Sequence, residues 1–214
     1  MPERFLAVYS DYVCPFCYLA WPGISELIGA GWQVELRAFE VRPSPLPLAG
    51  RPGAGRREAW EQVIASRAAA LGLAARLPEL QPRTRKAHEL AHHGRKLGMA
   101  ALVHERLFAA YFRDGLDIGR IDMLVQLGEE LGLEPSSVKV ELDVDQYTDA
   151  VVREEEEARA LGIHAVPAYV AGAGGKRVQH VGLLEGAELG AWLAQAGQAN
   201  EDETAQDGRL ARGT

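Results

Sequence analysis

The chain has 214 residues, of which 47% are hydrophobic and 25% are charged, and it contains two cysteines. The composition is that of a globular protein, and the length suffices for one sizeable core or for one domain with an inserted subdomain. A net charge of −7 excludes a general affinity for nucleic acid or for an anionic membrane surface, so neither is expected as a partner. No apolar stretch approaches the roughly 18 residues of a membrane span, and no signal-peptide pattern is apparent, which favours a cytoplasmic location.

The N-terminal part predicts a β-α-β unit. Residues 4–10 are mostly apolar and indicate a buried strand. Residues 14–30 indicate a helix, which Pro22-Gly23 would interrupt or bend. Residues 32–41 alternate with period two, which is typical of a second strand. The two cysteines lie at the junction of the first strand and the helix.

A proline- and glycine-rich connector, residues 42–56, separates this unit from a block of helices. Apolar residues at helical spacing, punctuated by Gly and Pro, predict four longer helices and a short one. The predicted helices are residues 58–73, 83–97, 99–113, 122–131 and 136–142.

The C-terminal part predicts an α-β-β-α unit. The helices are residues 147–161 and 184–196, and the strands are residues 165–171 and 177–181, joined by a glycine-rich turn. The acidic run from Glu154 to Glu157 is interpreted as a solvated helix face. From residue 200 the chain is polar and patternless, and we expect it to be disordered.

This order predicts an α/β protein with the thioredoxin fold, in which helices cover both faces of a four-stranded mixed sheet. A large all-helical insertion interrupts the fold. The expected boundaries are residues 1–45 and 144–198 for the two halves of the thioredoxin domain, 46–143 for the insertion and 199–214 for the disordered tail.

Cys14-Pro15-Phe16-Cys17 is the strongest functional signal in the chain. At the N-terminus of a helix, unpaired backbone N–H groups and the helix dipole favour the thiolate form of the first cysteine. The second cysteine lies about one turn later and can close a disulfide with the first. We therefore expect a redox-active disulfide, with Cys14 as the nucleophile, Cys17 as the resolving thiol, and no other cofactor.

The dipeptide Val166-Pro167 is the second signal. Proline is unfavourable inside a central strand, so its place at the start of the third strand predicts a cis peptide bond, with an ordinary trans proline as the alternative. In the predicted fold this peptide lies against the cysteine pair. The backbone of Val166 is then free to pair with an extended substrate.

Three polar side chains are candidates for roles beside the thiols. Glu40, late in the second strand, is a candidate to accept the Cys17 proton, although a carboxylate at a strand end is more often simply solvated. His164 is a candidate to approach the thiolate, and otherwise a loop histidine. Asp11 would raise the pKa of Cys14 if it lay close, and we interpret it as a cap or turn residue.

A competing motif is His88-Glu89-x-x-His92, which on a helix can place two zinc ligands on one face with Glu89 as the base. His104 or Glu105 would have to supply the third ligand. Basic residues flank the motif and indicate an exposed amphipathic helix rather than a buried catalytic one. A zinc site built from the two cysteines and histidines is a further alternative, and we expect no metal.

The sequence DYVCPFCY, residues 11–18, resembles the DsbA-like thioredoxin family, specifically its FrnE-type cytoplasmic branch. The resemblance covers nearly all of residues 4–196 and implies a thioredoxin domain with a helical insertion, acting as a thiol–disulfide oxidoreductase or isomerase. The other similar stretches are TRKAH at 84–88, LFAAYF at 107–112 with Asp117-Ile118, and LGIHAVP at 161–167.

The catalytic set expected from motif and resemblance is Cys14, Cys17 and Pro167. Expected substrate contacts are Pro15, Phe16, Val166 and His164. The partners would be protein or low-molecular-weight thiols and disulfides, together with an electron donor or acceptor that the sequence does not identify.

Two features of the sequence differ from those of related proteins. Ala168-Tyr169 replaces aromatic residues common after the proline, and the lack of a second cysteine pair excludes an internal electron relay.

A glutathione-dependent isomerase of the kappa-transferase type shares this layout, but usually carries serine at the position of Cys14. A binding protein with a groove lined by the helical block is another alternative, as is a homodimeric assembly.

Overall fold

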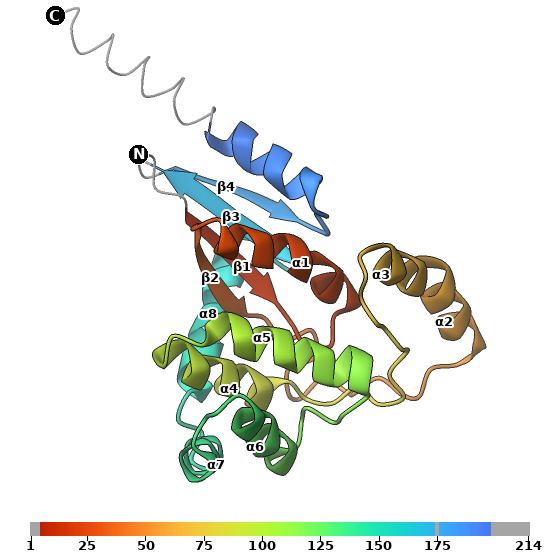
Figure 1. Ribbon diagram of the computed structural model, residues 1–214, viewed down its shortest axis with the longest axis vertical. Coiled ribbons are helices and arrows are strands. Elements are labelled where there is room, and N and C mark those ends of the chain that lie inside the picture. Colours follow the sequence, from red (N-terminus) through yellow and green to blue (C-terminus); the bar gives the residue numbers. More distant parts are fainter. Residues whose placement is uncertain (1–4, 174–175, 198–214) are drawn as a thin grey trace, which may run out of the picture.

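The computed structural model describes residues 5–173 and 176–197. Its sheet has the order β2-β1-β3-β4, with β1 and β2 parallel and the other neighbouring pairs antiparallel (Figure 1). This confirms the predicted four-stranded mixed sheet of a thioredoxin fold with a helical insertion. The strands are β1 (Phe5–Ser10), β2 (Gln33–Ala38), β3 (Ala168–Ala173) and β4 (Lys176–Val181).

The central strand β1 is buried on both faces because its side chains alternate between two apolar clusters. Leu6 and Val8 belong to the larger cluster, while Ala7 and Tyr9 belong to the smaller one. Successive side chains of a strand point to opposite faces, so a strand with layers on both sides needs apolar residues at consecutive positions.

Helices cover each face of the sheet (Figure 1). Helix α1 (Pro15–Gly29) and the helical residues 187–197 contribute to the larger cluster with β1, whereas α8 (Thr148–Ala160) contributes Ala158 to the smaller one. Pro22 does not interrupt α1, which continues through it. Trp21 and Ile24 on either side are buried in the larger cluster, and this packing offsets the backbone hydrogen bond that proline cannot donate.

Between β2 and α8 the chain forms only helices and connectors. Two of the helical stretches contain a π-helical segment: η1 joins α2 to α3, and η2 continues α5. The elements are α2 (Ala54–Ala59), η1 (Trp60–Ala65), α3 (Ser66–Ala70), α4 (Arg85–Lys96), α5 (Ala100–Phe108), η2 (Ala109–Asp114), α6 (Ile121–Glu130) and α7 (Pro135–Asp143).

Helix α4 is not the exposed basic helix that the sequence indicated, because one side of it is buried. Two of its buried polar residues have partners on neighbouring helices. Glu89 accepts a hydrogen bond from the hydroxyl of Thr148 at 2.7 Å, and His93 Nδ1 lies 2.6 Å from a carboxylate oxygen of Glu141. These partners compensate for the loss of water around the side chains of Glu89 and His93.

The acidic run of α8 is also not a uniformly solvated face, since Glu154 and Glu155 are buried. Glu154 Oε2 accepts a hydrogen bond from the backbone N–H of Ala38 at 2.7 Å, and Glu155 Oε1 accepts one from that of Glu40 at 2.9 Å. Strand β2 is an edge of the sheet, so amides on its outer side need partners from elsewhere. The two carboxylates supply them.

We expect the fold to lose stability in acid, because the carboxylate of Glu154 then becomes protonated. Burial alone would raise the pKa of Glu154, but the hydrogen bond of His92, the charge of Arg95 and the N–H of Ala38 together lower the pKa to about 2. The folded pKa is therefore below the unfolded one, so the stabilisation is complete above about pH 4.5 and is lost as the pH falls towards 2. We expect Glu154→Gln to cost about 3 kcal/mol of unfolding free energy at neutral pH, on the order of 1.4 kcal/mol per pKa unit.

Urea unfolding at pH 7 and at several values between 4.5 and 2.5 measures this effect. The difference between wild type and Glu154→Gln should shrink as the pH falls. Glu156→Gln, at an exposed position of the same helix, is the matched control and should change little at any pH. A difference for Glu154→Gln that is independent of pH would contradict the role assigned to the carboxylate.

Two further expectations concern segments at the limits of the structure. Gly174-Gly175 of the predicted turn, and the predicted disordered tail from residue 200, lie outside the described residues.

None of the helices in the described part of the chain combines the length and the apolar character that crossing a membrane requires.

Candidate active site

The two cysteines lie in the first turn of α1, directly after the end of β1. Cys14 is the N-cap residue of α1, and Pro15 occupies the first helical position, where a backbone donor is not needed. The carbonyl oxygen of Cys14 accepts hydrogen bonds from the N–H groups of Cys17 and Tyr18 at 3.1 and 3.2 Å, which closes the turn. Both cysteines are free thiols.

The two thiols differ strongly in acidity. The pKa of Cys14 is lowered, chiefly by a hydrogen bond from the Cys17 thiol and further by the N–H groups of Cys17 and Phe16, against the opposing effect of burial. The pKa of Cys17 is raised well above its usual value, first by burial and then by the neighbouring Cys14 sulfur. Cys14 is therefore the thiol that ionises, while Cys17, only 1% exposed, keeps its proton.

Val166 and Pro167, far away in sequence, lie next to Cys14. The Cys14 thiol donates a hydrogen bond to the carbonyl oxygen of Val166, with 3.5 Å between sulfur and oxygen. The Val166–Pro167 peptide bond is cis, and Pro167 is buried directly before β3. The carbonyl oxygen of Pro167 accepts the N–H of Gly182 at 2.9 Å, which ties this segment to the end of β4.

The other candidate substrate contacts differ in exposure. Phe16 is 38% exposed and Pro15 is half-buried, so both are accessible beside Cys14, which is 8% exposed. His164 is exposed in the loop that precedes Val166.

Asp11 does not cap α1 with its side chain, contrary to the cap interpretation. Its carbonyl oxygen accepts the N–H of Cys14 at 3.1 Å, so it is a turn residue through its backbone, while its fully buried carboxylate accepts the N–H of Val41 at 2.6 Å. The side chain turns inward because the chain after β2 presents a free amide there. The charge of Asp11 raises the pKa of both Cys14 and Cys17.

Glu40 is buried and forms an ion pair with Arg85, so it is not a solvated carboxylate at a strand end. Burial raises the pKa of Glu40, against the charges of His88 and Arg85 and the hydrogen bond from Arg85, which lower it.

The three motif residues His88, Glu89 and His92 have separate partners. His88 Nε2 lies 3.5 Å from a carboxylate oxygen of Asp11, His92 Nε2 lies 3.2 Å from Glu154, and Glu89 pairs with Lys86 and Thr148. Across residues 5–173 and 176–197, no three His, Cys, Asp or Glu side chains are placed to share a metal ion. The geometry therefore does not support the zinc alternatives.

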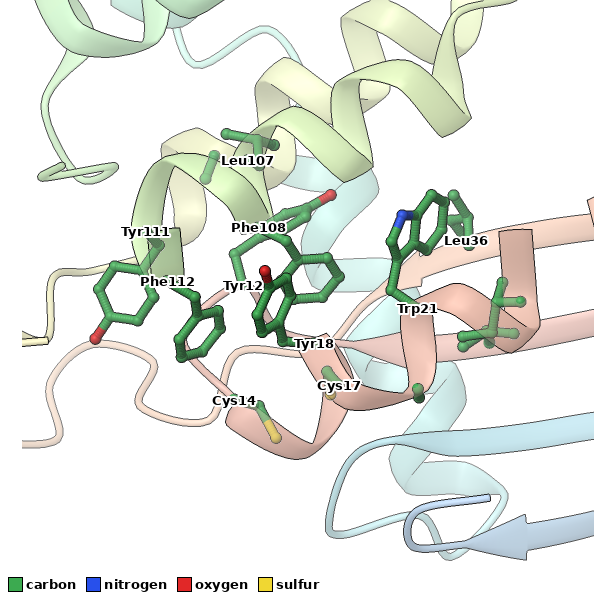
Figure 2. Packing of buried hydrophobic residues seen from close by; sticks show 14 of the residues in the cluster. Tyr12, Cys14, Cys17, Tyr18, Trp21, Leu36, Leu107, Phe108, Tyr111 and Phe112 are labelled. Carbon is green, nitrogen blue, oxygen red and sulfur yellow. The ribbon is translucent and has the colours of Figure 1, made fainter. Parts of the chain in front are cut away.

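An aromatic cluster joins the helical insertion to the active-site segment (Figure 2). The Phe108 ring lies 5.3 Å from that of Tyr12 and 5.8 Å from that of Tyr18, and Phe112 stacks on Tyr18 at 4.9 Å between ring centroids. The side chains of the insertion that would line a groove in the binding-protein alternative are instead buried in this core: Trp60, Leu107, Phe108, Tyr111 and Phe112. His104, which sequence reasoning treated only as a zinc ligand, lies with Nδ1 2.9 Å from the Tyr12 hydroxyl.

The fold and this arrangement agree with the comparisons to known proteins. The family model described as the DSBA-like thioredoxin domain matches residues 6–189. The chain belongs to this DsbA-like family. The uncharacterized protein YwbO of Bacillus subtilis (strain 168) is 35% identical over 175 residues, which are 78% of this chain and 86% of that protein.

Solved structures share the DsbA-like fold of this chain. A probable DsbA oxidoreductase of Streptomyces coelicolor superposes with a TM-score of 0.77 at 24% identity, covering 90% of this chain and 89% of the other. A 2-hydroxychromene-2-carboxylate isomerase superposes with a TM-score of 0.73 at 17% identity, covering 96% and 98% of the two chains. At these identities the likeness concerns the fold alone.

Proposed function

We propose that this DsbA-like protein is a thiol–disulfide oxidoreductase or isomerase of the FrnE type, with Cys14 as the nucleophile and Cys17 as the resolving thiol. The observation that carries the proposal is that two free thiols lie in the first turn of α1, with Cys14 Sγ 3.5 Å from the carbonyl oxygen before the cis-proline. The pKa shifts of the two thiols, down for Cys14 and up for Cys17, agree with it. A low-pKa thiol beside a protonated partner is what a dithiol exchange centre requires.

The exchange proceeds in two displacements. The Cys14 thiolate attacks one sulfur of a substrate disulfide, which forms a mixed disulfide and releases the other substrate sulfur as a thiolate. Cys17 then loses its proton and attacks Cys14 Sγ, forming the Cys14–Cys17 disulfide and releasing the second substrate thiolate. The substrate gains two electrons and the protein loses two. Oxidation of a substrate dithiol is the same sequence in reverse.

Two neighbours of Cys14 support a role in holding the substrate. Once Cys14 has ionised, and then in the mixed disulfide, its thiol hydrogen is absent, so the Val166 carbonyl oxygen at 3.5 Å has lost this donor. An N–H group of an extended substrate strand can replace it. The exposed ring of Phe16, between the two cysteines, offers an apolar contact to a substrate. These contacts suit protein and small thiol or disulfide substrates alike.

The test is to trap the mixed disulfide. In Cys17→Ser the first displacement remains and the second is removed, so incubation with oxidised glutathione or a disulfide-containing peptide should give a stable adduct, measured by intact mass spectrometry. In Cys14→Ser the adduct should be absent. If Cys17→Ser forms no adduct, or if the adduct maps to another residue, the assignment of Cys14 as nucleophile is wrong.

The alternative function is a glutathione-dependent isomerase, which the fold shared with 2-hydroxychromene-2-carboxylate isomerase brings into consideration. Such an enzyme would not need a resolving thiol. Turnover in disulfide exchange should therefore be lost in Cys17→Ser, whereas isomerase turnover with glutathione would survive this substitution.

A further inference from the structure

A hollow of about 460 Å³ lies on the face of the sheet opposite to the dithiol. Cys14 and Cys17 belong to the larger apolar cluster, whereas Ala7, Tyr9 and Val170, which line the hollow, belong to the smaller one. Helix α8 covers this second face chiefly over the edge strand β2 (Figure 1). The part of the face formed by β1 and β3 therefore stays open beside the C-terminal end of α8.

The register of the sheet explains why the floor of the hollow is apolar. Ala7 of β1 pairs with Val170 of β3, and side chains at paired positions lie on the same face. Phe5 follows the same alternation and also lines the hollow. The methyl groups of Ala7 and of Ala160, at the end of α8, are too small to fill the space between the sheet and the helix. A volume of this size is within the range of small-molecule sites, roughly 300–1,000 Å³.

Charged side chains stand at the rim of this apolar floor. Arg37 of β2 forms ion pairs with Glu35 and Glu157, so its charge is compensated within the protein. Arg177 of β4 lines the opposite side, is exposed, and pairs with no carboxylate among residues 5–173 and 176–197. One uncompensated cation beside an apolar floor favours an anionic ligand, although the whole chain has a net charge of −7.

Tyr9 adds a neutral hydrogen-bond donor to the lining. Burial raises the pKa of Tyr9, against the charges of Arg37 and Arg177, which lower it. The phenol therefore keeps its proton at neutral pH and can donate it to an acceptor in the hollow. A carboxylate suits this pair of donors, because a charged acceptor strengthens both hydrogen bonds. A dianion such as phosphate suits them less, since its second charge would lie near Glu157.

We propose that the hollow binds a small amphipathic monocarboxylate. Its carboxylate pairs with Arg177 and accepts a hydrogen bond from the Tyr9 hydroxyl, while its apolar body lies on Phe5, Ala7 and Val170. The site is on the other face of the sheet from Cys14 and Cys17. It therefore goes beyond the proposed function, and binding there is reversible and needs neither thiol.

Two aromatic anions and a neutral analogue test the proposal on the full-length protein. The fluorescent sulfonate 1-anilinonaphthalene-8-sulfonate should bind one equivalent with a Kd of about 10–100 µM, a usual range for a ligand of this size. The carboxylate 2-naphthoate should displace it. The alcohol 2-naphthylmethanol has the same apolar body without the charge, and should bind at least about tenfold more weakly than 2-naphthoate.

Two substitutions separate the charge from the apolar floor. Arg177→Gln should weaken 2-naphthoate about tenfold and leave the alcohol unchanged. Arg153→Gln removes an exposed arginine of α8 that does not line the hollow, and should change both affinities by less than about twofold. Ala160→Phe introduces a ring from an exposed position and fills the hollow, so it should abolish binding of all three compounds. Urea unfolding should confirm that Ala160→Phe is as stable as wild type.

Several results would overturn the proposal. They are the absence of saturable binding to wild type up to about 1 mM, equal affinity for 2-naphthoate and the alcohol, and binding that persists in Ala160→Phe. Sedimentation that shows a dimer dissociated by Ala160→Phe would mean that a second copy of the chain covers this face instead. Cys14→Ser should bind the three compounds like wild type, so failure of the dithiol function and failure of this site are observed separately.

Discussion

Replacement of Cys14 by serine is expected to reduce disulfide exchange by about 1,000-fold or more, the scale seen when a catalytic nucleophile is removed. The reason is chemical: a thiolate attacks disulfides, and a serine hydroxyl beside the same N–H groups stays protonated and does not. Insulin reduction with a regenerating thiol, or single-turnover reaction with DTNB, measures the loss.

We expect Cys14→Ser to remove the thiol without destabilising the fold. Cys14 is the N-cap of α1 and makes no side-chain cap hydrogen bond, whereas serine is among the best N-cap residues. We therefore expect Cys14→Ser to unfold at the wild-type temperature or slightly above it. Cys17→Ser is the matched control, because it carries the same chemical change one turn later and should retain the first displacement. Substantial exchange by folded Cys14→Ser would contradict the proposed function.

Phe108→Ala is expected to destabilise the fold strongly, by about 3–5 kcal/mol of unfolding free energy. Phe108 is 1% exposed and its ring lies 4.9 to 6.4 Å, between ring centroids, from the rings around it. Truncation removes buried apolar surface and leaves a cavity that neighbouring rings fill only in part. The surrounding rings are those of His104, Tyr12, Tyr18, Trp21 and Phe112.

Urea unfolding followed by circular dichroism measures this loss, and Leu102→Ala provides the control. Leu102 is on the same helix but 52% exposed, so its truncation should change the free energy by about 0.5 kcal/mol or less. Because Tyr12 and Tyr18 flank the dithiol in sequence, Phe108→Ala should also make Cys17 more accessible to alkylation. A cost below about 1 kcal/mol would show that the insertion contributes little to the active-site frame.

Local sequence patterns predicted most of the fold. The apolar run of β1, the alternation of β2 and the helical spacing in the insertion each reflect how neighbouring residues share a face, so short windows suffice to detect them. The boundaries differ by a few residues; for example, the third strand begins at Ala168 rather than at residue 165. The continuity of α1 through Pro22 was missed, because buried packing outweighs the local cost of proline there.

The amino-acid sequence by itself determined the dithiol. Two cysteines three residues apart, after a strand and at the start of a helix, are surrounded by the backbone N–H groups of that same helical turn. Only the tertiary structure decided what surrounds it. Asp11 faces His88 from 77 positions away, Cys14 contacts Val166 across 152 positions, and Glu154 caps an amide of β2 across 116. Such pairings depend on how separate elements pack, and a buried carboxylate or histidine carries no local mark that distinguishes it from a solvated one.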